Sequence, residues 1–177
     1  PVFLFDYADS MTGNTSRINE PLSRRQLLIT GLATTMMTSA ALAETDIIAH
    51  VKAPRLLGRD DAPINVIEFF SMTCSHCASF HANTFPTVKT RLIDEGVVRF
   101  EMRAFPLDGL ALRAHAMART VSGEKYFPLV NMLLKKQTSW ANAVDPIDAL
   151  RKLGRLAGIS NAEFDTTMRN RTVLESI

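Results

Sequence analysis

The only two cysteines of the chain, Cys74 and Cys77, stand three residues apart, directly after the apolar run 66–70. Such a pair at the junction of a strand and a helix is typical of a dithiol–disulfide site. The first thiol of such a pair lies at a helix N-terminus, where unpaired N–H groups and the helix dipole stabilise a thiolate. His76, between the cysteines, can add positive charge and favour the thiolate further. The pattern predicts thiol redox chemistry.

Two other interpretations of the cysteine pair stay open, a structural disulfide and half of a metal site. A disulfide that closes a loop of two intervening residues restrains the chain little, so a purely structural bridge explains the pair poorly. Zinc would need two further ligands. Among the other histidines only His81 lies within local reach, four residues after Cys77. We therefore expect redox chemistry that uses neither a metal nor a cofactor.

The length and charge of the chain limit the kinds of protein that it can be. With 177 residues, 46% of them hydrophobic, the chain is long enough for one domain with a hydrophobic core. Its formal net charge of +2 is small and spread along the sequence. Nothing in it resembles the basic stripe of a nucleic-acid-binding protein, so we expect no nucleic-acid partner.

The N-terminal quarter has the pattern of a secretory signal peptide. Arg24 and Arg25 precede an apolar stretch that ends in the small-x-small sequence 41–43. We expect residues 1–43 to be an N-terminal extension and signal peptide cleaved after Ala43, and residues 23–28 also resemble a twin-arginine export sequence. A retained membrane anchor is the alternative, although about 17 residues is near the lower limit for a span. Outside the cytosol a disulfide can persist, which favours oxidation or isomerisation of other proteins.

The remaining chain is predicted to contain a strand–helix–strand unit, residues 44–106, and a helical part, residues 107–177. The first unit has a short strand around Ile47 and Ile48, and then a buried central strand at 64–70. A helix opening near Cys74, kinked about Pro86 and ended by Gly96, leads to a second, parallel strand at 97–105. Helical spacing then predicts four helices, at 110–121, 126–137, 146–157 and 161–177.

Several apolar and aromatic side chains are candidates for the core. Trp140 and Tyr126 are expected to pack the helical part. Met72 is a candidate for an apolar surface beside Cys74 that touches unfolded substrates. His115 is expected to be a surface or packed helical residue rather than a member of the site. The phenylalanines expected in the core are Phe69, Phe70, Phe80, Phe85, Phe100 and Phe105.

The sequence 62–77, with Phe105-Pro106-Leu107 further on, resembles the DsbA-like thiol–disulfide oxidoreductases of the thioredoxin superfamily. The resemblance covers about residues 55–177. It implies that Cys74 is the exposed nucleophile, that Cys77 is the buried resolving cysteine, and that His76 destabilises their disulfide. It also implies that Glu68, six residues before Cys74, is a buried acid that shuttles a proton to or from Cys77.

The resemblance further implies an α/β fold, with a thioredoxin-like βαβ core and an inserted helical subdomain. In that family a cis-proline loop, a hairpin and a last helix follow, and we expect the chain to end at Ile177 before this part. The implied function is an exported enzyme that introduces disulfides into reduced secreted or periplasmic proteins and is reoxidised by a DsbB-like membrane partner. A reductase or isomerase on the same fold stays open, as does an inactive fragment or metal-binding module.

Overall fold

A computed structural model describes residues 47–177, all of which belong to one compact unit. The predicted signal peptide and export sequence lie outside the described residues. Within residues 47–177 no helix is long and apolar enough to cross a membrane.

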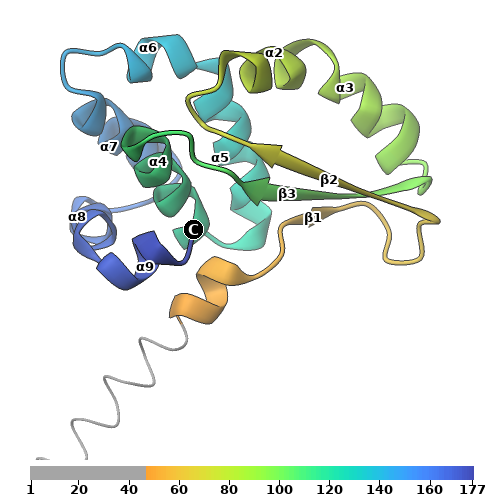
Figure 1. The fold of residues 1–177 in the computed structure, drawn as a ribbon, viewed down its shortest axis with the longest axis horizontal. Coiled ribbons are helices and arrows are strands. Elements are labelled where there is room, and N and C mark those ends of the chain that lie inside the picture. The colour runs from red at the N-terminus through yellow and green to blue at the C-terminus, as the bar shows by residue number, and fades with distance from the viewer. Residues whose placement is uncertain (1–46) are drawn as a thin grey trace, which may run out of the picture. The chain divides into compact units, whose positions relative to one another are not determined.

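Three strands form a mixed sheet in the order β1-β3-β2 (Figure 1). They are β1 (Leu56–Leu57), β2 (Ile64–Phe70) and β3 (Val98–Ala104). β1 is antiparallel to β3, whereas β2 is parallel to β3 along its whole length, from Ile64 opposite Val98 to Phe70 opposite Ala104. The predicted strand–helix–strand unit with parallel strands is thereby confirmed.

The predicted strand at 64–70 is right in its bounds and wrong in its burial and its central place. β2 pairs with β3 on one side only, so β3 is the central strand of the described sheet. Phe70 is buried, but Ile64 is 49% exposed and Phe69 is 60% exposed. The prediction of core positions for Phe69 and Phe105 is therefore wrong as well. On β3 the alternating apolar residues are buried as predicted: Val98, Phe100 and Met102.

Residues 47–52 are helical, so the predicted short strand around Ile47 and Ile48 is wrong. The spacing of Ile47 and Val51 explains the helix, because residues four apart share one helical face. Val51 is buried against Ala116 and Val173 of the helical part. The first strand comes later, at Leu56–Leu57.

The helical crossover between β2 and β3 consists of α2 (Ser75–Asn83), α3 (Phe85–Val88) and a π-helical turn, η1 (Lys89–Ile93). The break expected near Pro86 lies at Thr84, and Pro86 occupies the first turn of α3, where a missing N–H is tolerated. Gly96 ends the crossover as predicted, with φ of 74°. The N–H of Val97 donates to the carbonyl of Leu92 at 2.9 Å, which closes the helix end.

The helical part lies at the end of the sheet where β2 and β3 finish (Figure 1). It has two more breaks than predicted, at Lys136 and Asn170. Its helices are α4 (Gly109–Thr120), α5 (Gly123–Lys135), α6 (Gln137–Ala141), α7 (Pro146–Leu156), α8 (Asn161–Arg169) and α9 (Arg171–Glu175).

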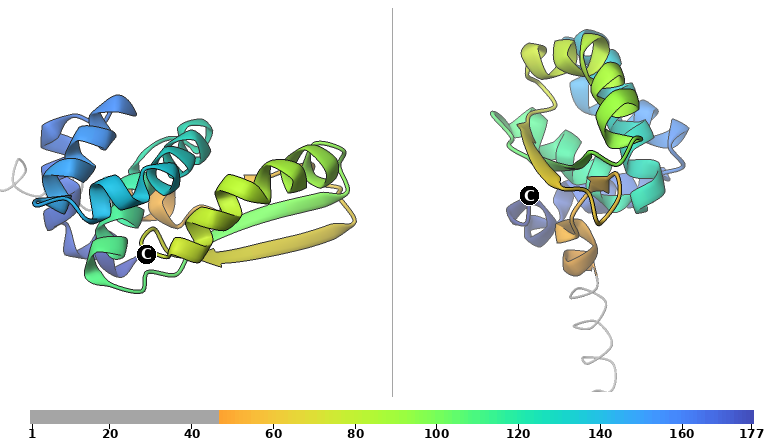
Figure 2. Two further views of the ribbon diagram at one scale, coloured as in Figure 1. Left: turned by 90° about the horizontal axis from the view of Figure 1, so that it is seen from above. Right: turned by 90° about the vertical axis from the view of Figure 1, so that its right-hand side faces the viewer.

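One hydrophobic core joins the sheet to the helical part. α2 and α3 lie along one face of the β2–β3 pair (Figure 2), and α2 also packs on α5. Tyr126 and Trp140 are buried in the helical part, as predicted, and Trp140 donates its indole N–H to the carbonyl of Leu133 at 2.8 Å. Phe80 and Phe85 pack partly buried against the same core. Met72, in the loop between β2 and α2, belongs to the same core.

Candidate functional site

Cys74 stands at the N-cap of α2, where the sequence places it. Its backbone is extended, with φ of −78° and ψ of 115°, and its Sγ accepts the N–H of Cys77 at 3.4 Å. Both cysteines are free thiols and partly exposed. The position of the helix start follows from the sequence. The run of β-branched and aromatic residues ends at Phe70, and the short segment 71–73 lets the chain turn into α2.

The surroundings of the two thiols push their pKa values in opposite directions. Burial opposes ionisation of Cys74, but hydrogen bonds from the backbone N–H groups of Cys77 and His76 and from the Cys77 thiol outweigh it, so the pKa of Cys74 is lowered. Burial, with the hydrogen bond to Cys74 and the charges of Cys74 and Glu68, raises the pKa of Cys77 to about 11. Cys74 is thus the thiol suited to attack, and Cys77 the one suited to hold a proton.

His76 lies in the first turn of α2 and is exposed. Its backbone N–H is one of the groups that stabilise the Cys74 thiolate. The tuning role of its imidazole stays a prediction.

Glu68 points from β2 toward α2 and meets His81. The Nε2 atom of His81 lies 2.9 Å and 3.1 Å from the two carboxylate oxygens of Glu68. The side chains are 13% exposed for Glu68 and 4% for His81. The sequence suggested His81 only as a candidate metal ligand beside the cysteine pair. In the structure its Nε2 atom instead contacts the carboxylate of Glu68. Within residues 47–177 no group of three or more His, Cys, Asp or Glu side chains is placed to hold a metal ion.

The loop before α2 is fixed by two side chains from the helical part. The side-chain amide of Gln137 donates to the carbonyls of Met72 and Cys74, both at 2.9 Å. Nε2 of the buried His115 accepts the N–H of Met72 at 3.3 Å. Met72 itself is fully buried, so its predicted place on an apolar surface is wrong. Its side chain packs in the core, and its backbone N–H and carbonyl are both held by hydrogen bonds with the helical part.

A third tie links the loop to the start of α4. The hydroxyl of Thr73 donates to Asp108 at 2.6 Å, and Asp108 caps α4 by accepting the N–H of Ala111 at 2.7 Å. The hydrogen bond from Thr73 is the main reason why the pKa of Asp108 is lowered. One carboxylate therefore joins the cysteine loop to a helix N-terminus.

The sequence did not predict His115, Gln137 or Asp108 as neighbours of the site, nor His81 as the partner of Glu68. A local pattern exists for His81, because residues four apart on a helix share a face and His81 follows Cys77 by four. Gln137 lies 63 residues from Cys74, and nothing in the local sequence links the two.

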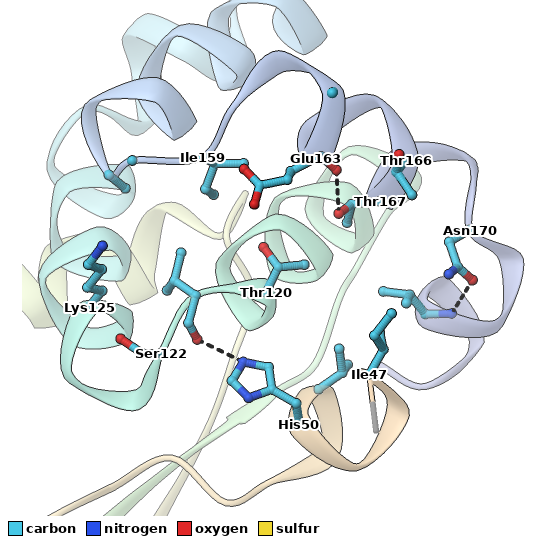
Figure 3. A pocket seen from close by; sticks show the side chains of 16 residues that line it. Ile47, His50, Thr120, Ser122, Lys125, Ile159, Glu163, Thr166, Thr167 and Asn170 are labelled. Atoms are coloured by element: carbon cyan, nitrogen blue, oxygen red, sulfur yellow. Dashed lines mark hydrogen bonds between the residues drawn. The ribbon is translucent and has the colours of Figure 1, made fainter. Parts of the chain in front are cut away.

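A separate hollow of about 700 Å³ lies between the helical residues 47–52, the end of α4 and helices α8 and α9 (Figure 3). Its lining includes His50, whose ring lies 3.1 Å from the carbonyl of Val121, and Glu163 of α8. None of the predicted site residues lines it. The redox site lies instead at the N-terminal end of α2, where both cysteines are partly exposed.

The sequence model of a family described as thioredoxin matches residues 50–177. The chain belongs to the thioredoxin family. Its thioredoxin-like fold, with a small sheet and many helices, agrees with the expectation from the sequence.

The relatives include proteins named for disulfide chemistry. A protein-disulfide oxidoreductase of Rickettsia bellii is 30% identical over 123 residues, 69% of this chain and 48% of the relative. Disulfide bond formation protein D of Bacillus subtilis is 35% identical over 68 residues, 38% of this chain and 31% of that protein. The chain spans about half the length of the first of these curated relatives.

Among solved structures, alpha-DsbA1 of Wolbachia pipientis is similar, with a TM-score of 0.64 and 31% identity over 70% of this chain and 63% of that one. BdbD of Bacillus subtilis shares the fold, with a TM-score of 0.57 at 24% identity. The resemblance to DsbA-like proteins noted from the sequence is confirmed.

Proposed function

We propose that the chain is a thiol:disulfide oxidoreductase that donates a Cys74–Cys77 disulfide to reduced cysteines of exported proteins. The observation that carries the proposal is the asymmetry of the two thiols. The pKa of Cys74 is lowered at the N-terminus of α2, and that of Cys77 is raised to about 11. A pair in which one thiolate is stabilised and exposed favours the reduced form, so its disulfide tends to oxidise others.

The exchange runs in two steps. A substrate thiolate attacks Sγ of Cys74, the Cys74–Cys77 bond breaks, and Cys77 leaves as a thiolate that takes up a proton. A second substrate thiolate then attacks the substrate sulfur of the mixed disulfide, and Cys74 leaves as its stabilised thiolate. Two electrons pass from the substrate to the enzyme. Glu68, near Cys77, is the group we assign to the proton in the first step, and His76 the one that favours the Cys74 thiolate.

Two single variants test the assignment. Cys74→Ser is expected to abolish disulfide transfer to a reduced peptide, because no Cys74–Cys77 disulfide can form and the substrate thiolate has no sulfur to attack at position 74. Cys77→Ser is expected to accumulate mixed disulfides between Cys74 and other proteins, which non-reducing electrophoresis detects, because no Cys77 thiol remains to attack Cys74 and release the bound protein. Equal and undiminished transfer by both variants would contradict the proposal.

Export is the setting in which this chemistry is useful, since a disulfide persists outside the cytosol. The pattern of residues 24–43 supports a signal peptide cleaved after Ala43. Catalytic turnover then needs a membrane partner, of the DsbB-like kind, to take the two electrons from reduced Cys74 and Cys77. N-terminal sequencing of the protein recovered from the periplasm should begin at Glu44; recovery only from the cytosol with an intact N-terminus would contradict export.

A further inference from the structure

We infer that His81 is a positioning residue of the redox site, which shares a proton with Glu68 and passes it, through that carboxylate, to and from the thiol of Cys77. The inference rests on the proposed function and adds a residue to it. Its basis is the contact of His81 Nε2 with both carboxylate oxygens of Glu68, at 2.9 Å and 3.1 Å.

Burial makes this contact more than a surface ion pair. A carboxylate that is 13% exposed is costly to bury unless a donor satisfies it. His81, at 4% exposure, supplies that donor, and three aromatic rings fix its orientation. The ring centroids of Phe85, Phe80 and Phe70 lie 4.7 Å, 5.4 Å and 6.2 Å from that of His81. The imidazole is thereby held with Nε2 on Glu68.

Both members of the pair are close to Cys77 in the fold. His81 follows Cys77 by one turn of α2, and the negative charge of Glu68 acts on the Cys77 thiol. When the disulfide opens, the electron pair of the broken bond stays on the Cys77 sulfur, which needs a proton in a half-buried place. The proton shared by His81 and Glu68 moves to that sulfur and leaves a neutral imidazole and a carboxylate. Disulfide formation returns the proton to the pair.

The other titratable groups around the pair are less suited to this transfer. His76 on α2 is exposed. His115 on α4 is held neutral by burial and the charge of Arg119, which lower its pKa to about 3. Tyr126 on α5 keeps its proton, because burial raises its pKa to about 12. The β3 residue opposite Glu68 is the apolar Met102.

The test separates proton transfer from support of the fold. In His81→Gln the amide keeps a donor for Glu68 but cannot carry a proton, and Glu68→Gln removes the acid. The Cys77 alkylation rate is measured against pH in the full chain with Cys74→Ser. Removing the carboxylate charge should move the profile to lower pH, and removing the imidazole that takes up the proton of the Cys77 thiol should move it to higher pH, each by about half a unit or more. His50→Gln, away from the site, is the matched control and should move nothing.

Disulfide transfer is measured in parallel, with Cys74 intact. Both variants should transfer about 10-fold more slowly at neutral pH, and the double variant no more slowly than the slower single one, because the two groups act as one unit. An alkylation profile and a transfer rate that His81→Gln leaves unchanged would overturn the inference, whatever the unfolding midpoint of the variant. If the unaltered chain transfers no disulfide, the proposed function fails, while the alkylation profiles still decide the role of His81.

One measurement needs no variant of the pair. The imidazole ¹⁵N resonances of His81 should shift between the reduced and the oxidised protein, because the proton leaves or returns with the redox state of Cys77. Those of His50 should stay fixed. Unchanged His81 resonances would contradict proton sharing even if every variant failed to fold.

Discussion

At the scale of single residues, the site consists of two thiols of opposite character that are three positions apart. Hydrogen bonds at the helix N-terminus lower the pKa of Cys74. Burial and the negative charge of Glu68 raise the pKa of Cys77. The sequence predicts the position of both, since a CxxC after an apolar strand is a local pattern. It does not predict His115 or Gln137, because these reach the loop only after the helical part has packed.

The difference between the thiols can be measured by alkylation. In Cys77→Ser, Cys74 should react with iodoacetamide at a pH below that of an ordinary cysteine, because its thiolate is stabilised. In Cys74→Ser, Cys77 should react only at distinctly higher pH. Mass spectrometry of alkylation against pH gives both midpoints, and coinciding midpoints would contradict the asymmetry.

His115 should make stability fall in mild acid. Its pKa is lowered from 6.5 to about 3 in the folded protein by burial and by Arg119. Between these values the unfolded chain binds a proton that the folded chain does not, so stability is full above the upper value and is lost as the pH falls. The loss is about 1.4 kcal/mol per pH unit at most. Urea unfolding between pH 6.5 and 5 measures it.

The control for this prediction is His115→Gln, which cannot take up that proton. The free energy of unfolding of this variant should fall less steeply over the same pH range, whatever its absolute stability. An equal slope in the two proteins would show that another group is responsible.

At the scale of helices and strands, the burial of a strand depends on the neighbours that it has in the folded protein. The bounds of β2 and β3 follow from local apolar patterns and are predicted well. The exposure of β2 is not predicted, because a β-branched and aromatic run is equally compatible with a central or an edge strand. The Ile47 region is ambiguous for a related reason, since a short apolar run fits either helix or strand until its packing partners, Ala116 and Val173, are known.

Adjacent phenylalanines of β2 provide a matched comparison. Phe70→Ala should lower the free energy of unfolding by about 3–5 kcal/mol, because Phe70 is buried in the core. Phe69→Ala should cost about 1 kcal/mol or less, because Phe69 is 60% exposed and its ring centroid lies 5.8 Å from the guanidinium carbon of Arg103. Chemical denaturation measures both, and equal losses would contradict the edge position of β2.

The loop between β2 and α2 should depend on α6. Gln137→Leu removes two hydrogen bonds to the carbonyls of Met72 and Cys74, which should lower the free energy of unfolding by about 2 kcal/mol. Ser139→Leu, at an exposed position of the same helix, should change it by about 0.5 kcal/mol or less. Equal effects of the two changes would mean that Gln137 does not hold the loop.

At the scale of the whole molecule, the helical part and the sheet together build the redox site. The loop that carries Cys74 is held by Asp108 and His115, from the N-cap and body of α4, and by Gln137 of α6, and β2 supplies Glu68. The thioredoxin-like fold was predictable from the sequence because its motif and its strand–helix–strand order are local. The ties between the helical part and the loop were not, since they join residues 35 to 65 positions apart.

The reduction potential of the Cys74–Cys77 pair tests the disulfide-donor proposal most directly. The chain is equilibrated in graded glutathione buffers, and its free thiols are counted after alkylation. A stabilised Cys74 thiolate predicts one two-electron transition at an oxidising potential, on the order of −120 mV. A midpoint near about −270 mV, or no defined transition, would contradict the disulfide-donor function.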